Sequence, residues 1–234
     1  MELFHATPPN YEAAARCFRA AADAGSGDGL AMLGLCQLEG LGMPADPTQA
    51  RVLLKQAAAR RSALGRFQLG RALMTGRGGD ADEAAGLTAY VAAAAMGHAE
   101  ATFNLANCLF AGVGCIPDRL AAKSLYLRAR ALGCMLRPQG VLVKRSELES
   151  VRILAERFAD PNRMFFLVQE RQQQLAQAYA EVPARSTHEG EAVKPRPLQS
   201  AGRLAAGVVA AMAGTLGHYL RPTSDDAGPT TIDF

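Results

Sequence analysis

Aromatic side chains are scarce in this sequence of 234 residues: only 6% are Phe, Trp or Tyr, and there is no Trp at all. The apolar share is nevertheless 49% on a set that counts alanine, so most of the apolar volume comes from small side chains. Alanine is the best helix former, and small side chains let helices approach closely. The composition therefore excludes a disordered chain and favours tightly packed helices in one or two globular units.

Lysine is also scarce, with four residues in the chain, and the formal net charge is only +3. The arginines that carry most of the positive charge are scattered and form no basic stripe along the sequence. Proteins that bind nucleic acid concentrate basic side chains on one face to neutralise phosphates. We therefore do not expect a nucleic-acid partner.

The sequence has few cysteines, and their number is odd: Cys17, Cys36, Cys108, Cys115 and Cys134. Their spacing fits no zinc site, and it favours free thiols in a reducing compartment. The first 25 residues lack the charged start, apolar segment and small-residue cleavage site of a secretory signal. We therefore predict a cytoplasmic protein.

Groups that carry out chemistry are missing too. The four histidines are His5, His98, His188 and His218, and none stands at metal-ligand spacing from another His or Cys. Phosphate-binding loops follow a strand and need a lysine, whereas the glycine pairs of this chain follow predicted helices and lack one. The sequence predicts no catalytic residue, no cofactor and no metal, and so a protein that is not an enzyme.

What the sequence does contain is a repeat of 36 residues. Each unit has a Leu followed by a small residue, then two glycines, then an aspartate. The equivalent positions are Leu33, Leu69 and Leu105; Gly40, Gly76 and Gly112; Gly42, Gly78 and Gly114; and Asp46, Asp82 and Asp118. Agreement at this many positions excludes coincidence.

Each repeat predicts two helices. The first glycine of the pair suits the left-handed residue that ends a helix, and the aspartate six residues later suits the cap that starts the next. Asp46-Pro47 is the clearest start, since proline is tolerated at the first helical position. Such a pair cannot bury its apolar stripe alone, so the units must stack. We predict an all-α fold: an α-solenoid of stacked helix-turn-helix repeats with C-terminal helices.

The period divides the chain. We expect a solenoid over 1–134, with a half unit at 11–27 and full units at 28–62, 63–98 and 99–134. Beyond Cys134 the period fails, and 135–181 reads as a helical cap. Ser146 and Glu149 predict a capping box for a helix ending near residue 159. Asp160-Pro161 predicts a second helix to about 181, with its Phe-rich first turn buried or, alternatively, docking a partner.

The remaining residues read as a linker, an apolar helix and a tail. Three prolines among Ser, Thr, Glu and Gly make 182–200 a linker. The Ala- and Gly-rich segment 201–220 is uncharged only over 204–217, which is short for a membrane span. It can pack on the protein or a partner, associate with a membrane, or stay unfolded. The tail, 221–234, ends in an Ile-Asp-Phe sequence that could serve as a docking peptide.

The residues from Leu33 to Ala59, LGLCQLEGLGMPADPTQARVLLKQAAA, and their counterparts in the next two units resemble the Sel-one-like repeat family, a branch of the tetratricopeptide-like solenoids. The resemblance covers about 11–134. One departure is Arg61, which stands where Gly25, Gly97 and Gly133 occupy the equivalent position. The resemblance implies a scaffold, often bacterial, that brings proteins together. Secreted members place cysteine pairs across each repeat, and this chain does not.

A partner-binding face is predicted from positions that vary between repeats. The first helices of such solenoids line the concave surface, and two positions three residues apart share one side of each helix. These positions are Met32 and Leu35, Gln68 and Arg71, and Asn104 and Asn107. Arg71 and Asn107 are the expected polar anchors. The alternatives are that these side chains are only solvated, or that Asn104 supports the neighbouring turn.

The predicted function is therefore that of a non-catalytic adaptor whose concave face binds a partner protein or peptide. The alternative is a membrane-associated assembly or regulatory factor tethered through 201–220.

Overall fold

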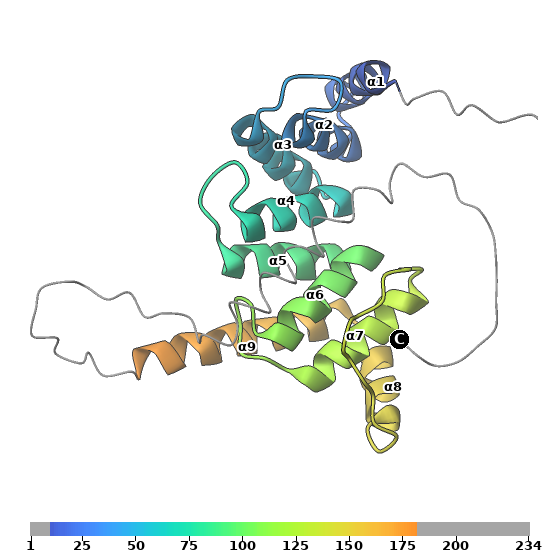
Figure 1. Cartoon of the computed structure of the whole chain (residues 1–234), viewed down its shortest axis with the longest axis vertical. Helices are drawn as coiled ribbons and strands as arrows, with labels where there is room; N and C mark the ends of the chain where they lie inside the picture. The colour runs from blue at the N-terminus through green and yellow to red at the C-terminus, as the bar shows by residue number, and fades with distance from the viewer. Residues whose placement is uncertain (1–9, 182–234) are drawn as a thin grey trace, which may run out of the picture. The chain divides into compact units, whose positions relative to one another are not determined.

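The computed structural model describes residues 10–181, which form nine α-helices and no strand (Figure 1). The predicted all-α repeat fold is confirmed. The described residues fall into two compact units, one ending at Asp82 and the other beginning at Glu83. The first unit has four helices: α1 Tyr11–Asp23, α2 Gly27–Glu39, α3 Pro47–Ala59 and α4 Ala63–Thr75. The second has five: α5 Glu83–Ala94, α6 Ala99–Ala111, α7 Arg119–Ala131, α8 Leu148–Arg157 and α9 Pro161–Ala180.

Side-chain caps start the helices at the predicted period. The Asp46 carboxylate accepts a hydrogen bond from the Gln49 amide at 3.0 Å, as expected for the start of α3. Two of the first helices have serine caps: Ser26 accepts from the Gly29 amide at 3.0 Å, and Ser62 accepts from the Gly65 amide at 2.8 Å. Each cap satisfies an amide that the helix itself leaves unpaired.

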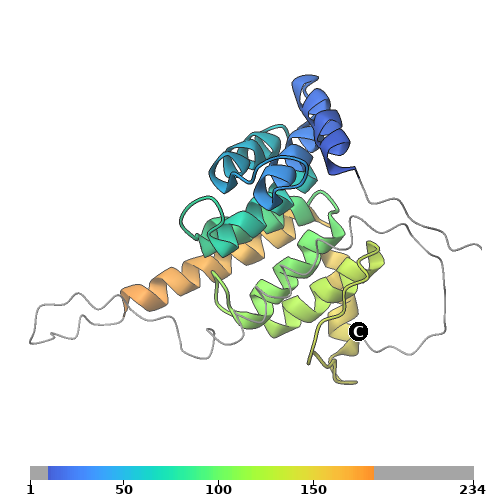
Figure 2. The same cartoon turned by 45° about the horizontal axis from the view of Figure 1, so that its top comes forward.

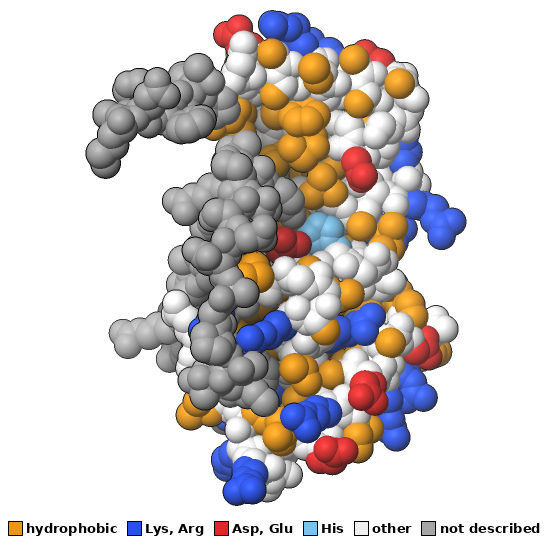
Figure 3. Space-filling view, turned by 90° about the vertical axis from the view of Figure 1, so that its right-hand side faces the viewer, with side chains coloured by type: hydrophobic (Ala, Val, Ile, Leu, Met, Phe, Trp, Pro, Cys, Tyr) orange, Lys and Arg blue, Asp and Glu red, His pale blue; other side chains and the backbone are white. Residues whose placement is uncertain are grey.

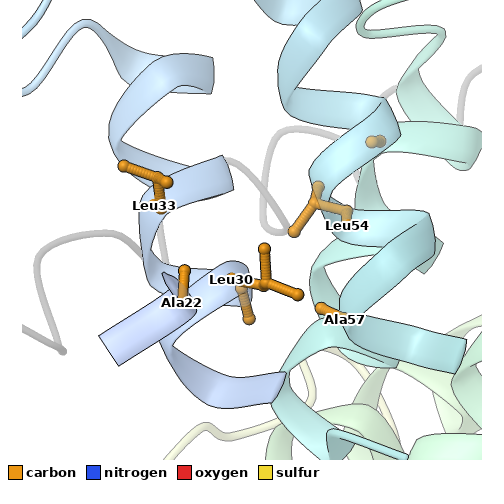
Figure 4. Close-up of a cluster of buried hydrophobic side chains, with 7 residues drawn as sticks. Ala22, Leu30, Leu33, Leu54 and Ala57 are labelled. Carbon is orange, nitrogen blue, oxygen red and sulfur yellow. The ribbon is translucent and has the colours of Figure 1, made fainter. Parts of the chain in front are cut away.

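The core of the first unit is built from small and medium apolar side chains. The buried cluster joins three helices: it contains Ala22 from α1, Leu30 from α2, and Leu54 and Ala57 from α3 (Figure 4). Each of these side chains is at most 7% exposed. Helix α2 packs against α1, α3 and α4. Neither α1 nor α2 buries its apolar face without its neighbour, which is why consecutive helices must stack.

The second glycine of each pair lies in the loop that joins the two helices of a repeat. At this glycine the loop contacts the backbone at the start of a helix in the preceding repeat. A Cβ on Gly78 would lie 2.0 Å from the Pro47 carbonyl oxygen, and one on Gly114 would lie 2.8 Å from the Glu83 carbonyl oxygen. Both glycines also have positive φ, at 77° and 69°. The glycine pair of the repeat is therefore explained by backbone contact between successive helix pairs.

In the second unit, α9 packs along α5 (Figures 1 and 2). It also holds the loop between α6 and α7, because the Arg171 guanidinium lies 2.9 Å from the Asp118 carboxylate and the Arg171 carbonyl accepts from the Ile116 amide at 3.2 Å. The Gln172 side chain donates to the Ala84 carbonyl at 3.0 Å. These contacts fasten α9 to α5 and to the loop between α6 and α7.

The capping box predicted from Ser146 and Glu149 is wrong. Helix α8 begins at Leu148, its N-cap residue is Glu147, and that cap makes no side-chain hydrogen bond. The Glu147 carboxylate instead accepts from Lys123 Nζ at 2.6 Å and from the Lys144 amide at 3.1 Å. The side chain at the helix start is thus engaged by a lysine of α7, a contact that the local sequence does not show.

The Phe-rich turn of α9 is buried only in part. Met164 and Val168, four residues apart, are 1% and 2% exposed, so one face of the helix is covered. Phe165 and Phe166 are 39% and 70% exposed because they lie off that face. The expectation that the whole turn is buried is therefore wrong for these two phenylalanines.

The linker 182–200, the Ala- and Gly-rich segment 201–220 and the tail 221–234 lie outside the described residues. In the described part of the chain, no helix combines the length and apolarity that a membrane span requires.

Candidate functional site

The six predicted recognition residues lie on three first helices. Met32 and Leu35 are on α2 and the Gln68 and Arg71 pair is on α4, both in the first unit. Asn104 and Asn107 are on α6, in the second unit. Within the first unit α2 packs against α4, which brings four of the six residues onto neighbouring helices.

Gln68 and Arg71 form one polar pair on α4. Arg71 Nη1 donates to Gln68 Oε1 at 3.0 Å, and the guanidinium carbon lies 6.0 Å from the centre of the Phe67 ring. The two polar side chains are 0% and 7% exposed. Gln68 Nε2 is buried and has no hydrogen-bond partner.

Asn104 and Asn107 differ from each other in their surroundings. The Asn107 carboxamide oxygen accepts from the Tyr126 hydroxyl at 2.7 Å, and the Tyr126 ring lies 5.2 Å from that of Phe103. Burial raises the pKa of Tyr126 well above its usual value, so this hydroxyl keeps its proton and remains a donor. Asn104 is 2% exposed, and its Nδ2 is buried without a partner.

Gln68 and Asn104 therefore share an unusual property at equivalent positions of successive repeats. Each buries a carboxamide NH₂ group that finds no acceptor. Leaving a buried donor unpaired costs about 1–3 kcal/mol, and native structures contain few such groups. Sequence analysis identified the two positions because they vary, but burial and the missing acceptor depend on neighbouring helices and were not predictable.

Met32 and Leu35 supply apolar surface beside this polar pair. Leu35 is 5% exposed, whereas Met32 is half-buried. Asn107 is likewise half-buried. Of the six predicted recognition residues, two are therefore partly open and four are buried between helices.

His98 is the N-cap residue of α6. Its Nδ1 accepts from the Ala101 amide at 3.2 Å and lies 3.4 Å from a Glu100 carboxylate oxygen. Ser26 and Ser62 occupy the same position in the earlier repeats. The sequence analysis missed this recurring cap position, although it repeats with the 36-residue period.

The cysteines are free thiols, and four of the five are buried. Burial raises the pKa of Cys36, and it raises that of Cys108 further with help from the charges of Cys115 and Glu83. The pKa of Cys115 is raised to about 12, mainly by burial. Protonated, enclosed thiols are poor nucleophiles, so these side chains act as small core residues. Within residues 10–181 no three His, Cys, Asp or Glu side chains gather as a metal site would require.

The comparison with family models gives the decisive observation. The model of the Sel1 repeat matches residues 3–26, 27–62, 63–98 and 99–134, more than half of the chain. The chain belongs to the Sel1 repeat family. Proteins with Sel1 repeats are generally scaffolds for interactions between proteins rather than catalysts.

Two solved bacterial structures are similar to this Sel1 repeat chain. A Sel1 repeat protein from Oxalobacter formigenes is 25% identical, with a TM-score of 0.45 over 59% of this chain and 96% of its own. A protective antigen of uropathogenic Escherichia coli strains, which displays an SLR fold, is 18% identical, with a TM-score of 0.48 over 95% of this chain and 38% of its own. A comparison with curated proteins found no match.

Proposed function

We propose that this Sel1 repeat protein is a non-catalytic adaptor that binds a partner protein or peptide on the first-helix face. That face is defined by Met32, Leu35, Gln68, Arg71, Asn104 and Asn107. The observation that carries the proposal is the Asn107 carboxamide, which is half-buried on α6, is held by the Tyr126 hydroxyl at 2.7 Å, and stands at a position that varies between repeats. A partly open carboxamide can donate to a main-chain carbonyl of a partner.

The neighbouring side chains support a peptide-like partner. Arg71 is held by Gln68, so its charge is positioned on α4 and not free to sample many rotamers. Asn107 is positioned by Tyr126 in the same way on α6. Preorganised polar groups beside an apolar side chain such as Met32 lower the entropy cost of binding.

The proposed compartment is the cytoplasm. The buried thiols of Cys36 and Cys108 occupy equivalent core positions and form no disulfide framework across the repeats. Secreted domains of modest size commonly rely on such a framework. The thiols therefore support a reducing environment.

The experiment is affinity capture from the native host with the full chain, followed by binding measurements with the captured partner. The double variant Arg71→Glu with Asn107→Ala should lose most of the partner while keeping a helical circular dichroism spectrum and a cooperative unfolding transition. Arg145→Glu, an exposed residue outside the first helices, serves as the control. Unchanged partner affinity in a folded double variant would reject the proposed face.

A further inference from the structure

A groove lies between α7 and α8 in the second unit, away from the first helices. It has a volume of about 460 Å³. Its lining combines small apolar side chains with two arginines and one glutamate: Leu127, Arg128, Ala131, Arg152, Ala155, Glu156 and Ala159. Three of the seven are alanines, and their short side chains leave space between the two helices.

The chemistry of the groove favours an anionic occupant with apolar side chains. Arg128 and Arg152 contribute two positive charges to the lining of the groove, and Glu156 contributes a single negative charge. Arg128 Nε is buried and has no hydrogen-bond partner. A guanidinium binds a carboxylate through paired, charge-assisted hydrogen bonds, which would give this nitrogen an acceptor.

The surrounding sequence carries the same sign of charge. Residues 128–163 contain eight Lys or Arg and four Asp or Glu, an excess larger than the net charge of the whole chain. Figure 3 shows lysine and arginine side chains, with some Asp and Glu side chains between them, among hydrophobic ones over the lower part of the face. An acidic segment would be attracted to this surface.

The chain itself contains a segment with the matching chemistry. Residues 222–234, PTSDDAGPTTIDF, carry Asp225, Asp226 and Asp233 and no lysine or arginine. Ile232 and Phe234 flank the third aspartate and supply apolar side chains for the alanine surface. By contrast, residues 182–221 carry five Lys or Arg and two Asp or Glu, so among the residues after α9 the acidic character is confined to 222–234.

The distance to be spanned fits the chain length. Helix α9 starts two residues after Ala159 and has 20 residues, so its far end lies about 30 Å from the groove at 1.5 Å per residue. Forty residues separate Glu181 from Pro222. A flexible chain of 40 residues would have a root-mean-square span of about 35 Å, and the span would be about 40 Å if 201–220 is helical, as the sequence predicts. Tethering at this match gives an effective concentration in the millimolar range, so even a weak contact is occupied.

We propose that the α7–α8 groove is the docking site of residues 222–234 of the same chain. The aspartates pair with Arg128 and Arg152, and the apolar side chains of Ile232 and Phe234 rest on Ala131, Ala155 and Ala159. The groove is separate from the first-helix face, so this docking does not depend on the proposed partner binding.

Paramagnetic broadening in the full chain tests the proposal. The exposed Cys17 is replaced in Cys17→Ser, and a nitroxide is attached at Ser224→Cys, beside the acidic segment. The amide signals of Ala131, Ala155 and Ala159 should lose their intensity. The loss should vanish in Asp225→Asn with Asp226→Asn and Asp233→Asn, a variant that leaves residues 10–181 unaltered. Undiminished signals in the chain with its natural aspartates would overturn the proposal.

Charge reversal separates docking from a general effect of charge. Arg128→Glu with Arg152→Glu should restore the alanine signals, whereas Arg145→Glu with Arg157→Glu, the same change in net charge outside the groove, should not. Adding Asp225→Arg, Asp226→Arg and Asp233→Arg to the groove variant should bring the broadening back. Failure of this rescue in a folded protein, or broadening that passes from a labelled copy to an unlabelled one, contradicts docking within one chain. Both double variants, Arg128→Glu with Arg152→Glu and Arg145→Glu with Arg157→Glu, should still capture the partner. A failure of tail docking is therefore distinguishable from a failure of partner binding on the first-helix face.

Discussion

Arg61 is the residue at which the repeat departs most from its own pattern. Its φ is +60°, and within residues 10–181 it is the one residue other than glycine with positive φ. The equivalent Gly25, Gly97 and Gly133 have φ between 83° and 93°, and a Cβ on any of them would meet nothing within 4 Å. Space is therefore ample at this turn, and the cost of a side chain is conformational.

We expect Arg61→Gly to stabilise the first unit. The left-handed conformation costs a residue with a side chain roughly 1–2 kcal/mol, and glycine avoids this cost. Glycine also makes the unfolded chain more flexible, which lowers the free energy of unfolding by about 0.4–1 kcal/mol. The free energy of unfolding, measured in urea, should rise by about 0.5–1 kcal/mol. Gly97→Ala is the reverse substitution at an equivalent position and should lower the free energy of unfolding by a similar amount. An Arg61→Gly protein less stable than the natural chain would contradict this explanation.

Thiol burial gives a second prediction at the residue scale. Cys17 is exposed and the other four cysteines are buried, so one thiol per folded chain should react rapidly with an aromatic disulfide reagent at mildly alkaline pH. Cys17→Ser should remove this fast reaction and leave four thiols that react only after denaturation. Rapid reaction of two or more thiols in the folded protein would show that the core cysteines are accessible.

At the scale of the helix pair, the close crossing of loop and helix start makes Gly78 more sensitive than an open glycine. Gly78 and Gly97 have similar φ, 77° and 83°, but only at Gly78 would a Cβ lie 2.0 Å from a backbone oxygen. Gly97→Ala should cost about 1 kcal/mol for conformation alone, whereas Gly78→Ala should cost about 3 kcal/mol because the loop must move as well. Equal losses in thermal or urea unfolding would mean that the crossing tolerates a side chain.

The contact between α7 and the start of α8 gives a pH dependence. The hydrogen bond from Lys123, followed by the Lys144 amide, holds the pKa of Glu147 below its usual value of 4.5. A carboxyl whose folded pKa is lowered stabilises the protein above 4.5, and this contribution is lost as the pH falls through the lower folded pKa. Wild type and Glu147→Gln should therefore differ in free energy of unfolding near neutral pH and converge in acid. A difference that stays constant through the acid range would assign the loss to something other than this ionisation.

At the scale of the whole molecule, the 36-residue period predicted what depends on local sequence. The αL glycines at Gly40, Gly76 and Gly112, with φ of 71°, 68° and 74°, and the cap at Asp46 follow directly from residue type and spacing. The start of α8 did not follow, because Glu147 is committed to Lys123, 24 residues away. Contacts of that kind leave no periodic signal.

The same limit on prediction from sequence applies to the candidate site. Variation between repeats selected Gln68 and Asn104, but that both carboxamide nitrogens are buried without acceptors follows from packing between helices. The sequence could identify the positions and not their environment. The docking groove between α7 and α8 was not predicted at all, because its alanines belong to helices that the repeat does not relate.

Asn107→Ala, compared with Tyr126→Phe, tests the central claim, that the first-helix face binds a partner, most directly. Each substitution removes the hydrogen bond between the two side chains and should lower the free energy of unfolding by about 1 kcal/mol. If the half-buried Asn107 carboxamide also contacts a partner, Asn107→Ala should in addition weaken binding of the captured partner about tenfold, equivalent to about 1.4 kcal/mol. Two equally stable variants, of which Asn107→Ala binds more weakly, are the predicted result. An Asn107→Ala variant that binds as tightly as Tyr126→Phe would contradict the claim.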